Sequence, residues 1–307
     1  MTMMRSDKMG KKLYLLQVTT PGRILELDPD TGGLRTLVAG LNTHPDGIAI
    51  DPLNRRLFVT YMGAATRADS SEFFQADGRL ESMTTEGRDR RLLAGNGIFV
   101  TGKQLIHDAE NGLLYWCDRE GMRVFCARED GSDLKVLVQT GLFPADSGDY
   151  TRHCVGVAID NQQGYIYWTL KGPPKGGQGQ ILRAGLRLPR GSEASNRPDI
   201  EVMLSGLPEP IDLDYDAARG IMYWTDRGDD ASGGNSLNCA RLVDGRLTDH
   251  QILARGLQEA IALVRDADNR RMWITDLGGN VWEYSLSQGG PLRSIARLGA
   301  LTGITYG

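Results

Sequence analysis

A hexapeptide pattern that recurs three times constrains the fold of this chain more than any other feature. The copies read LLYWCD at 113–118, YIYWTL at 165–170 and IMYWTD at 221–226. Two weaker copies, RLFVTY at 56–61 and MWITD at 272–276, follow the same spacing. In all five, an aspartate that ends a preceding apolar segment lies seven residues before an aromatic residue of the copy. These aspartates recur at intervals of 50 to 57 residues, which indicates a repeat architecture.

Each repeat contains four short runs that are typical of β-strands. The runs are rich in β-branched and aromatic residues and are bounded by glycine, aspartate and asparagine. The 39 glycines are what many tight turns between short strands require. No segment has the apolar periodicity of an amphipathic helix. Four strands in about 40 to 50 residues is the unit of a β-propeller blade.

The two ends of the chain supply a sixth blade. Residues 13–41 contain a second, third and fourth strand but no first strand, whereas LTGITY at 301–306 resembles a lone first strand. Pairing the two would cover strand edges that are otherwise exposed. We therefore predict an all-β fold, a six-bladed β-propeller with four antiparallel strands per blade, closed by pairing of the C-terminal strand with the N-terminal blade. In this interpretation residues 1–12 are a disordered N-terminal segment and residues 13–307 form a single domain.

The repeated letters have a structural explanation in such a fold. We expect the aromatic residues to pack between sheets, and the Thr and Asp that follow them to organise the next turn. The aspartates that end the first strands are expected to bond turn backbones. The residues predicted to be core are Tyr115, Trp116, Tyr167, Trp168, Tyr223 and Trp224.

At these hexapeptides the chain resembles the YWTD β-propeller family, which is best known from lipoprotein-receptor ectodomains. The resemblance covers nearly the whole chain and implies the six-bladed fold. In fold only, the chain is also similar to propellers of the strictosidine synthase and gluconolactonase type and to peptidyl-hydroxyglycine lyase. Those enzymes place their chemistry at the mouth of the central channel.

Composition limits the partners and the location. The formal net charge is −4, so a basic surface for nucleic acid is not expected. No apolar stretch approaches the ~18 residues of a membrane span. The N-terminus has no signal-peptide core or cleavage site, and the four cysteines lack disulfide or CxxC spacing. We therefore expect a cytoplasmic protein with free thiols and no membrane partner.

The repeat register places the long insertions on one side of the predicted ring, here called the top face. They are residues 62–78, 143–154, 171–180 and 226–238. Long connections above a rigid scaffold commonly mark a binding site.

The residue seven before each repeat's aspartate starts the inner strand on that same face. These positions hold His44, Thr101, His153, Glu209 and Glu259, so four of the five side chains are titratable. Asp46 and Lys103 come two positions later in their repeats. All should ring the channel mouth.

Three interpretations of this ring compete. It can be a polar mouth whose residues satisfy one another. It can be an acid–base site, in which Glu209 or Glu259 abstracts a proton and His44, His153 or the other glutamate returns it. It can be a metal centre with these same four residues as ligands, a mixed set that suits Zn²⁺ or Fe²⁺ better than Ca²⁺.

From these alternatives we expect an enzyme, a hydrolase, lyase or isomerase, that acts on a small organic molecule by acid–base chemistry. It would need no cofactor, unless a divalent Zn or Fe ion assists. The alternative is a non-catalytic YWTD propeller that binds a protein or peptide on its top face. The residues expected to contact the substrate are Asp46, Thr101, Lys103, Phe73, Phe74, Tyr150 and Arg152. Neither the substrate nor the oligomeric state follows from the sequence.

Overall fold

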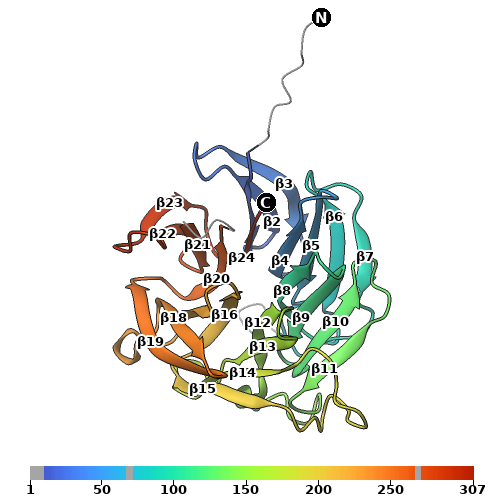
Figure 1. Ribbon diagram of the computed structural model, residues 1–307. Coiled ribbons are helices and arrows are strands. Elements are labelled where there is room, and N and C mark those ends of the chain that lie inside the picture. Colours follow the sequence, from blue (N-terminus) through green and yellow to red (C-terminus); the bar gives the residue numbers. More distant parts are fainter. Residues whose placement is uncertain (1–9, 67–71, 267–270) are drawn as a thin grey trace, which may run out of the picture.

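The computed structural model describes residues 10–66, 72–266 and 271–307. Its strands form six four-stranded antiparallel sheets arranged as blades around a central axis (Figure 1). The predicted all-β, six-bladed propeller is therefore confirmed. Two single-turn 3-10 helices, η1 (Tyr150–Arg152) and η2 (Asp230–Ser232), are the helical elements of the described residues.

Each blade is given below from its inner to its outer strand. Blade A contains β24 (Leu301–Tyr306), β1 (Leu13–Gln17), β2 (Gly22–Leu27) and β3 (Leu34–Leu41). Blade B contains β4 (Pro45–Asp51), β5 (Arg56–Tyr61), β6 (Arg79–Thr84) and β7 (Arg91–Ala94). Blade C contains β8 (Gly102–Asp108), β9 (Leu113–Asp118), β10 (Arg123–Arg128) and β11 (Lys135–Gln139). Blade D contains β12 (Cys154–Asp160), β13 (Tyr165–Leu170), β14 (Gly179–Gly185) and β15 (Glu201–Leu207). Blade E contains β16 (Pro210–Asp216), β17 (Ile221–Asp226), β18 (Ser236–Val243) and β19 (Arg246–Arg255). Blade F contains β20 (Ala260–Arg265), β21 (Arg271–Asp276), β22 (Asn280–Ser285) and β23 (Arg293–Arg297).

Blade A is built from both ends of the chain, as predicted. Strand β24 pairs antiparallel with β1, with Leu13 opposite Tyr306 and Leu15 opposite Ile304. The pairing extends past both strands, because Lys12 and Gly307 exchange backbone hydrogen bonds of 2.9 and 3.1 Å. Residues 10–12 of the segment predicted to be disordered are thus part of the ordered structure, and residues 1–9 lie outside the described residues.

The predicted aromatic core residues all lie in the interior, where they pack between neighbouring blades. Trp116, Trp168 and Trp224 are completely buried. Trp168 of blade D belongs to one apolar cluster with Tyr115 and Val124 of blade C. Packing across the blade interface is why the aromatic position recurs in every repeat.

The aspartates at the ends of the inner strands bond the turns that follow, as predicted. Asp51, Asp108 and Asp160 each accept two backbone N–H groups two and three residues later. Asp216 accepts the backbone N–H of Arg219, three residues later. The turn after the fifth aspartate, Asp266, spans residues 267–270, which lie outside the described residues.

The prediction for the Thr of the hexapeptides is wrong. Instead of organising a turn, its hydroxyl donates to a backbone carbonyl on the inner strand of the next blade. Thr60 bonds Lys103 O at 2.6 Å, and Thr169 bonds Ile211 O at 2.8 Å. Thr225 bonds Ile261 O at 2.5 Å. Each hydroxyl also accepts a backbone N–H of its own inner strand. These threonines therefore join neighbouring blades around the channel.

Blade C departs from this pattern, because Cys117 occupies the threonine position. Its thiol reaches Gly156 O at 3.4 Å, a weak hydrogen bond. We expect Cys117→Thr to raise the free energy of unfolding by about 1 kcal/mol by supplying the missing hydroxyl. Urea denaturation measures the change, and Thr169→Cys, which makes the reverse exchange in blade D, should lower stability by a similar amount. A less stable Cys117→Thr variant would show that the slot cannot hold the branched side chain.

Candidate functional site

The long loops lie on the top face, where the inner strands begin. They connect β5 to β6, β11 to β12, β13 to β14 and β17 to β18. The first of them includes residues 67–71, which lie outside the described residues. The opposite, bottom face carries the short turns that follow the inner strands. This arrangement places the channel mouth of the top face beneath these four loops, whereas another long connection, residues 186–200 between β14 and β15, leaves from the bottom face.

A cavity of about 20 Å³ lies at this mouth. The side chains around it come from two register positions, one on the inner strands and one directly after the second strands. They are Asp46, Lys103, Val155, Ile211 and Ile261 from the inner strands, and Arg119, Lys171 and Arg227 from the second position. A volume of this size accommodates about one water molecule, whereas small-molecule sites enclose roughly 300–1,000 Å³.

The three basic residues after the second strands were not predicted from the sequence. Arg119, Lys171 and Arg227 directly follow β9, β13 and β17, and the equivalent residues after β5 and β21 are Met62 and Leu277. Three cations at one register position are a sequence signal, but these residues begin loops, where basic side chains are ordinary. The three side chains come together at the channel mouth only because the six blades close into a ring.

The last aspartate of the second strand fixes the backbone at the mouth. Asp226 Oδ1 accepts the N–H groups of Glu209 and Gly228, both at 2.9 Å. Asp118 Oδ1 likewise accepts the N–H of Thr101 at 2.7 Å and of Gly121 at 3.2 Å. The predicted role of this aspartate in the next turn is thus confirmed, and it also positions the ring residues of its own blade.

Ion pairs hold the cations of the mouth. Lys103 Nζ lies 2.8 Å from Asp46 Oδ2, and both side chains are buried. Arg119 pairs with Glu120 at 2.6 Å. Glu209, which is 1% exposed, contacts Arg227 and lies 3.5 Å from Lys171 Nζ.

Burial shapes the protonation of these groups. Desolvation lowers the pKa of Lys103 to about 8, against the opposing effect of Asp46. The pKa of Lys171 falls to about 8 through burial, opposed by Glu209 and reinforced by the charges of Arg119 and Arg227. Burial also lowers the pKa of His153 to about 4, so that its imidazole is neutral at pH 7.

The ring predicted from the sequence is assembled only in part. His153 is buried, and its Nε2 lies 2.8 Å from Ser147 O. His44 Nδ1 lies 3.4 Å from Gly63 O, and Thr101 Oγ1 donates to Phe73 O at 3.0 Å. Glu259 is about one-third exposed and reaches Arg227 at 3.5 Å. The expectation that His44, His153, Glu209 and Glu259 line the deepest cavity is not met by the described residues, because these side chains bond protein groups beside the mouth.

Of the seven residues expected to contact a substrate, Asp46 and Lys103 line the mouth cavity. The other five do not line it. The hydroxyl of Tyr150 donates to Glu72 Oε1 at 2.8 Å, so the loops 62–78 and 143–153 are in contact. Phe73 is buried against the ring of His44 at 5.3 Å, and Phe74 is partly buried. Arg152 pairs with Asp149 at 2.9 Å, away from the cavity.

The four residues expected as metal ligands do not form a ligand cluster among the described residues. The His, Cys, Asp and Glu side chains that do gather, with ligand atoms within 4.8 Å of one another, are Asp51, His107 and Glu129 near the bottom face. Their polar atoms already form hydrogen bonds with one another and with the backbone. His107 bonds Glu129 and Ile50 O, and Asp51 bonds the turn after β4. The four cysteines are free thiols.

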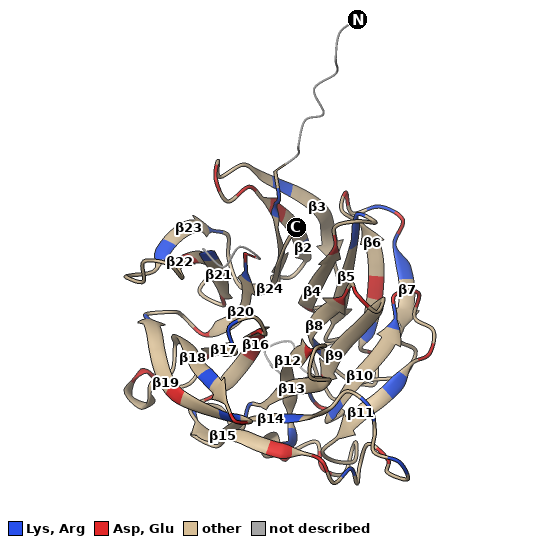
Figure 2. Ribbon diagram, in the orientation of Figure 1, with Lys and Arg blue, Asp and Glu red and all other residues tan. Residues whose placement is uncertain are grey.

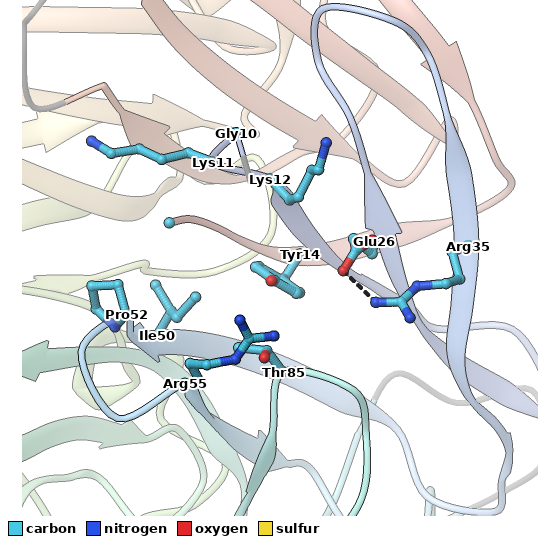
Figure 3. A pocket seen from close by; sticks show the side chains of 11 residues that line it. Gly10, Lys11, Lys12, Tyr14, Glu26, Arg35, Ile50, Pro52, Arg55 and Thr85 are labelled. Atoms are coloured by element: carbon cyan, nitrogen blue, oxygen red, sulfur yellow. Dashed lines mark hydrogen bonds and ion pairs between the residues drawn. The ribbon is translucent and has the colours of Figure 1, made fainter. Parts of the chain in front are cut away.

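Larger cavities lie elsewhere. One of about 370 Å³ opens between the lower halves of the inner strands, where Asp212 accepts the backbone N–H of Leu263. A groove of about 430 Å³ lies between blades A and B (Figure 3). Three of its four cations form ion pairs, Arg35 with Glu26, Lys12 with Asp28 and Arg55 with Glu86, and Lys11 Nζ lies 5.4 Å from the centre of the Tyr306 ring. Figure 2 shows acidic and basic positions spread over the blades rather than collected in one region.

Comparison with known proteins gives relatives that match most of the chain. A Pyricularia oryzae protein named low-density lipoprotein receptor-related protein 1 is 38% identical over 97% of this chain and 99% of its own length. A Cochliobolus heterostrophus protein named 3-hydroxyacyl-CoA dehydrogenase-like protein LAM1 is also 38% identical, over 89% of this chain, which spans only 58% of that protein. No family model matches the chain.

Solved structures share the fold at low identity. A chain of a nidogen/laminin complex superposes with a TM-score of 0.70 at 17% identity, covering 97% of this chain and 98% of that one. A gluconolactonase from Xanthomonas campestris gives 0.61 at 17% identity, covering 94% and 87%. Within the described residues, the model contains no helix with the length and apolar character needed to cross a membrane.

Proposed function

This chain belongs to the family of the Pyricularia oryzae protein named low-density lipoprotein receptor-related protein 1, and from that premise we propose that it is a non-catalytic β-propeller that binds a protein or peptide on its top face. The observation that carries the proposal is the closed channel mouth. Its cavity of about 20 Å³ is too small for an organic substrate. Glu209 and His153, which acid–base chemistry would need, are held by neighbouring protein groups.

The top face also offers what a binding surface needs. Two of its long loops are joined by the hydrogen bond from Tyr150 to Glu72, and loops held on a rigid scaffold commonly form binding surfaces. Two exposed apolar side chains lie on its inter-blade links: Ile98 before β8 is 40% exposed, and Leu142 before β12 is 61% exposed. Single exposed apolar side chains are common on protein surfaces, so these two mark only where an apolar partner would contact the top face. In support, the relative carries a receptor name and the nidogen/laminin neighbour comes from a complex.

The test compares exposed apolar residues on the two faces. Leu142→Asp and Ile98→Asp alter the top face, and Leu53→Asp alters the bottom face, where Leu53 is 87% exposed in the turn after β4. Proteins of the encoding organism that co-purify with the wild type should also co-purify with the Leu53→Asp variant. They should bind the top-face variants at least about tenfold more weakly, because a charge in an apolar contact is costly.

The enzyme alternative gives a different result. A panel of lactones and related small substrates would then show turnover that Glu209→Gln lowers by ~10²–10⁴-fold while the protein remains folded. Such turnover, or equal loss of partners from variants of both faces, would contradict a non-catalytic top-face binder. The cytoplasmic location inferred from the sequence remains a prediction, which a tagged protein would test.

A further inference from the structure

The cavity of about 370 Å³ in the lower half of the central channel, here called the lower cavity, has the size of a small-molecule site. Inner strands of blades A, B, C, E and F line it, and most of the lining residues are aliphatic. Small-molecule sites enclose roughly 300–1,000 Å³ and combine apolar walls with a few polar groups. The lower cavity is separate from the small cavity at the top-face mouth.

Two polar side chains share one register level of its wall. Gln104 is the third residue of β8 and Asp212 is the third residue of β16, whereas the other inner strands have glycine or alanine at this position. Gln104 is 4% exposed and Asp212 is 6% exposed. On β20 the same level is at Ala262, and Asp266, the last residue described before the gap, is four residues further on, about 13 Å of extended chain.

The amide oxygen of Gln104 is an unused hydrogen-bond acceptor. Gln104 Nε2 donates to Asp46 Oδ1 at 3.2 Å, which fixes the orientation of the amide. No described residue donates to Gln104 Oε1, and this atom is not sealed from solvent. The hydroxyl of Thr305, the fifth residue of β24, likewise has no hydrogen-bond partner among the described residues, although Thr305 is only 8% exposed. Both residues line the lower cavity, so an occupant of this cavity is what satisfies them.

Asp212 is a buried acid that no cation of the described residues pairs with. Its two carboxylate oxygens accept the backbone N–H groups of Leu213 and Leu263 at 2.9 and 3.0 Å, and each oxygen can accept one bond more. Burial raises the pKa of Asp212 to about 8 against these two hydrogen bonds, and the charges of Asp214 and Asp46 act in the same direction as burial. A buried carboxylate with acidic neighbours is stabilised in its charged form by a nearby cation.

The basic side chains of the lining are held by other acids. Arg265 contacts Asp214 and lies 3.2 Å from Asp216. His107 Nε2 lies 2.5 Å from Glu129 Oε1. The donors of the lining are thus engaged while acceptors remain open, which favours a ligand that donates hydrogen bonds and carries positive charge.

We propose that the lower cavity binds a small organic amine, whose ammonium group is held by Asp212 and Gln104. The ammonium group donates hydrogen bonds to the carboxylate of Asp212 and to Oε1 of Gln104. The carbon skeleton of the ligand lies against the aliphatic wall, and Thr305 bonds a second polar group of the ligand. The site is independent of whether the top face binds a partner.

Calorimetric titration with two matched pairs of probes tests this site. The members of each pair differ in one group, an amine against a hydroxyl: cyclohexylamine against cyclohexanol, and glucosamine against glucose. At pH 8 at least one amine should bind saturably, and its hydroxyl counterpart should bind at least about tenfold more weakly, because a charged hydrogen bond is lost. The proposal is wrong if neither amine binds, or if amine and hydroxyl bind equally well in both pairs.

Three variants locate the binding. Asp212→Asn removes the charge at nearly constant shape and should weaken amine binding at least about tenfold. Gln104→Met removes the amide acceptor and should weaken it at least about threefold, which keeps the test valid if the first variant does not fold. The matched control, Asp133→Asn in the turn after β10, alters a side chain that is 48% exposed and should bind like the wild type. Amine binding that is unchanged in a folded cavity variant would overturn the proposal.

The pH dependence separates binding at Asp212 from adventitious binding. The ammonium group displaces the proton that Asp212 holds below pH 8, so the apparent affinity should rise about tenfold per unit from pH 6 to pH 8 and then level off. The rise should disappear in Asp212→Asn, which keeps the other charged groups around the site: Asp46, Asp214, Arg265 and His107. Crystals soaked in the amine should show its nitrogen at Asp212. An affinity independent of pH, or a cavity that holds water alone, would contradict the proposal.

Discussion

Deleting residues 300–307 is expected to unfold the protein at 25 °C, a loss of more than about 5 kcal/mol in the free energy of unfolding. The segment contains β24, the inner strand of blade A, whose Leu301, Thr302 and Ile304 are buried. Its removal exposes the edge of β1 and takes away the carbonyl of Thr302, to which Thr275 of blade F donates. Far-UV circular dichroism during urea denaturation measures the effect.

Adding the missing strand back provides the control. A synthetic peptide of residues 299–307 should restore the cooperative transition of the truncated protein in a concentration-dependent way, because binding to the folded state stabilises it. A peptide of the same composition in scrambled order should not. A truncated protein that melts like the full chain would show that five complete blades and an open sixth blade are sufficient for full stability. Closure of blade A by β24 would then not be needed for folding.

Glu209→Gln is expected to lower the free energy of unfolding by about 3 kcal/mol. Glu209 is buried, and its carboxylate pairs with Lys171 and Arg227 and accepts the backbone N–H of Lys175 at 3.0 Å. An amide of the same shape carries no charge, so the buried Lys171 and the partly buried Arg227 lose their shared partner. Breaking one side of a buried pair costs about 3–5 kcal/mol, and the lower end applies because Arg227 reaches solvent.

Glu259→Gln makes the same chemical change at the neighbouring ring position. Glu259 is 38% exposed and contacts Lys175 and Arg227 at 3.2 and 3.5 Å, so the loss should stay below about 1 kcal/mol. Chemical denaturation of both variants gives the difference directly. Equal small losses would mean that the mouth is hydrated and its ion pairs weak, which would also remove the basis for a closed mouth.

The fold was predictable because its determinants are periodic in the sequence. The seven-residue spacing from each inner-strand aspartate to an aromatic residue of the second strand reflects the fixed length of a hairpin, so it survives variable loops. The spare strand at 301–306 could be matched to the blade that lacked one. The hydroxyl bridges could not be found this way, since Thr60 acts on Lys103 O, which lies 43 residues later on another blade.

The site was predicted less well, for a physical reason. The register correctly brought Asp46 and Lys103 to the mouth. It could not show that Glu209 would meet Arg227 and Lys171, since these cations belong to loops whose path the repeat does not specify. Applying the same register to the residue after each second strand would have revealed the three basic positions. The degree to which the roof loops close over them is a tertiary property that the repeat pattern does not contain.

The seam of blade A has a mechanical consequence. Because β1 and β24 are antiparallel, Lys12 and Gly307 lie at the same end of the seam and are joined by the last pair of backbone bonds. A force that pulls the two ends of the chain apart would load these hydrogen bonds one pair at a time, in the manner of a zipper, since they lie across the strands. The ring would thus open at low tension, starting from blade A.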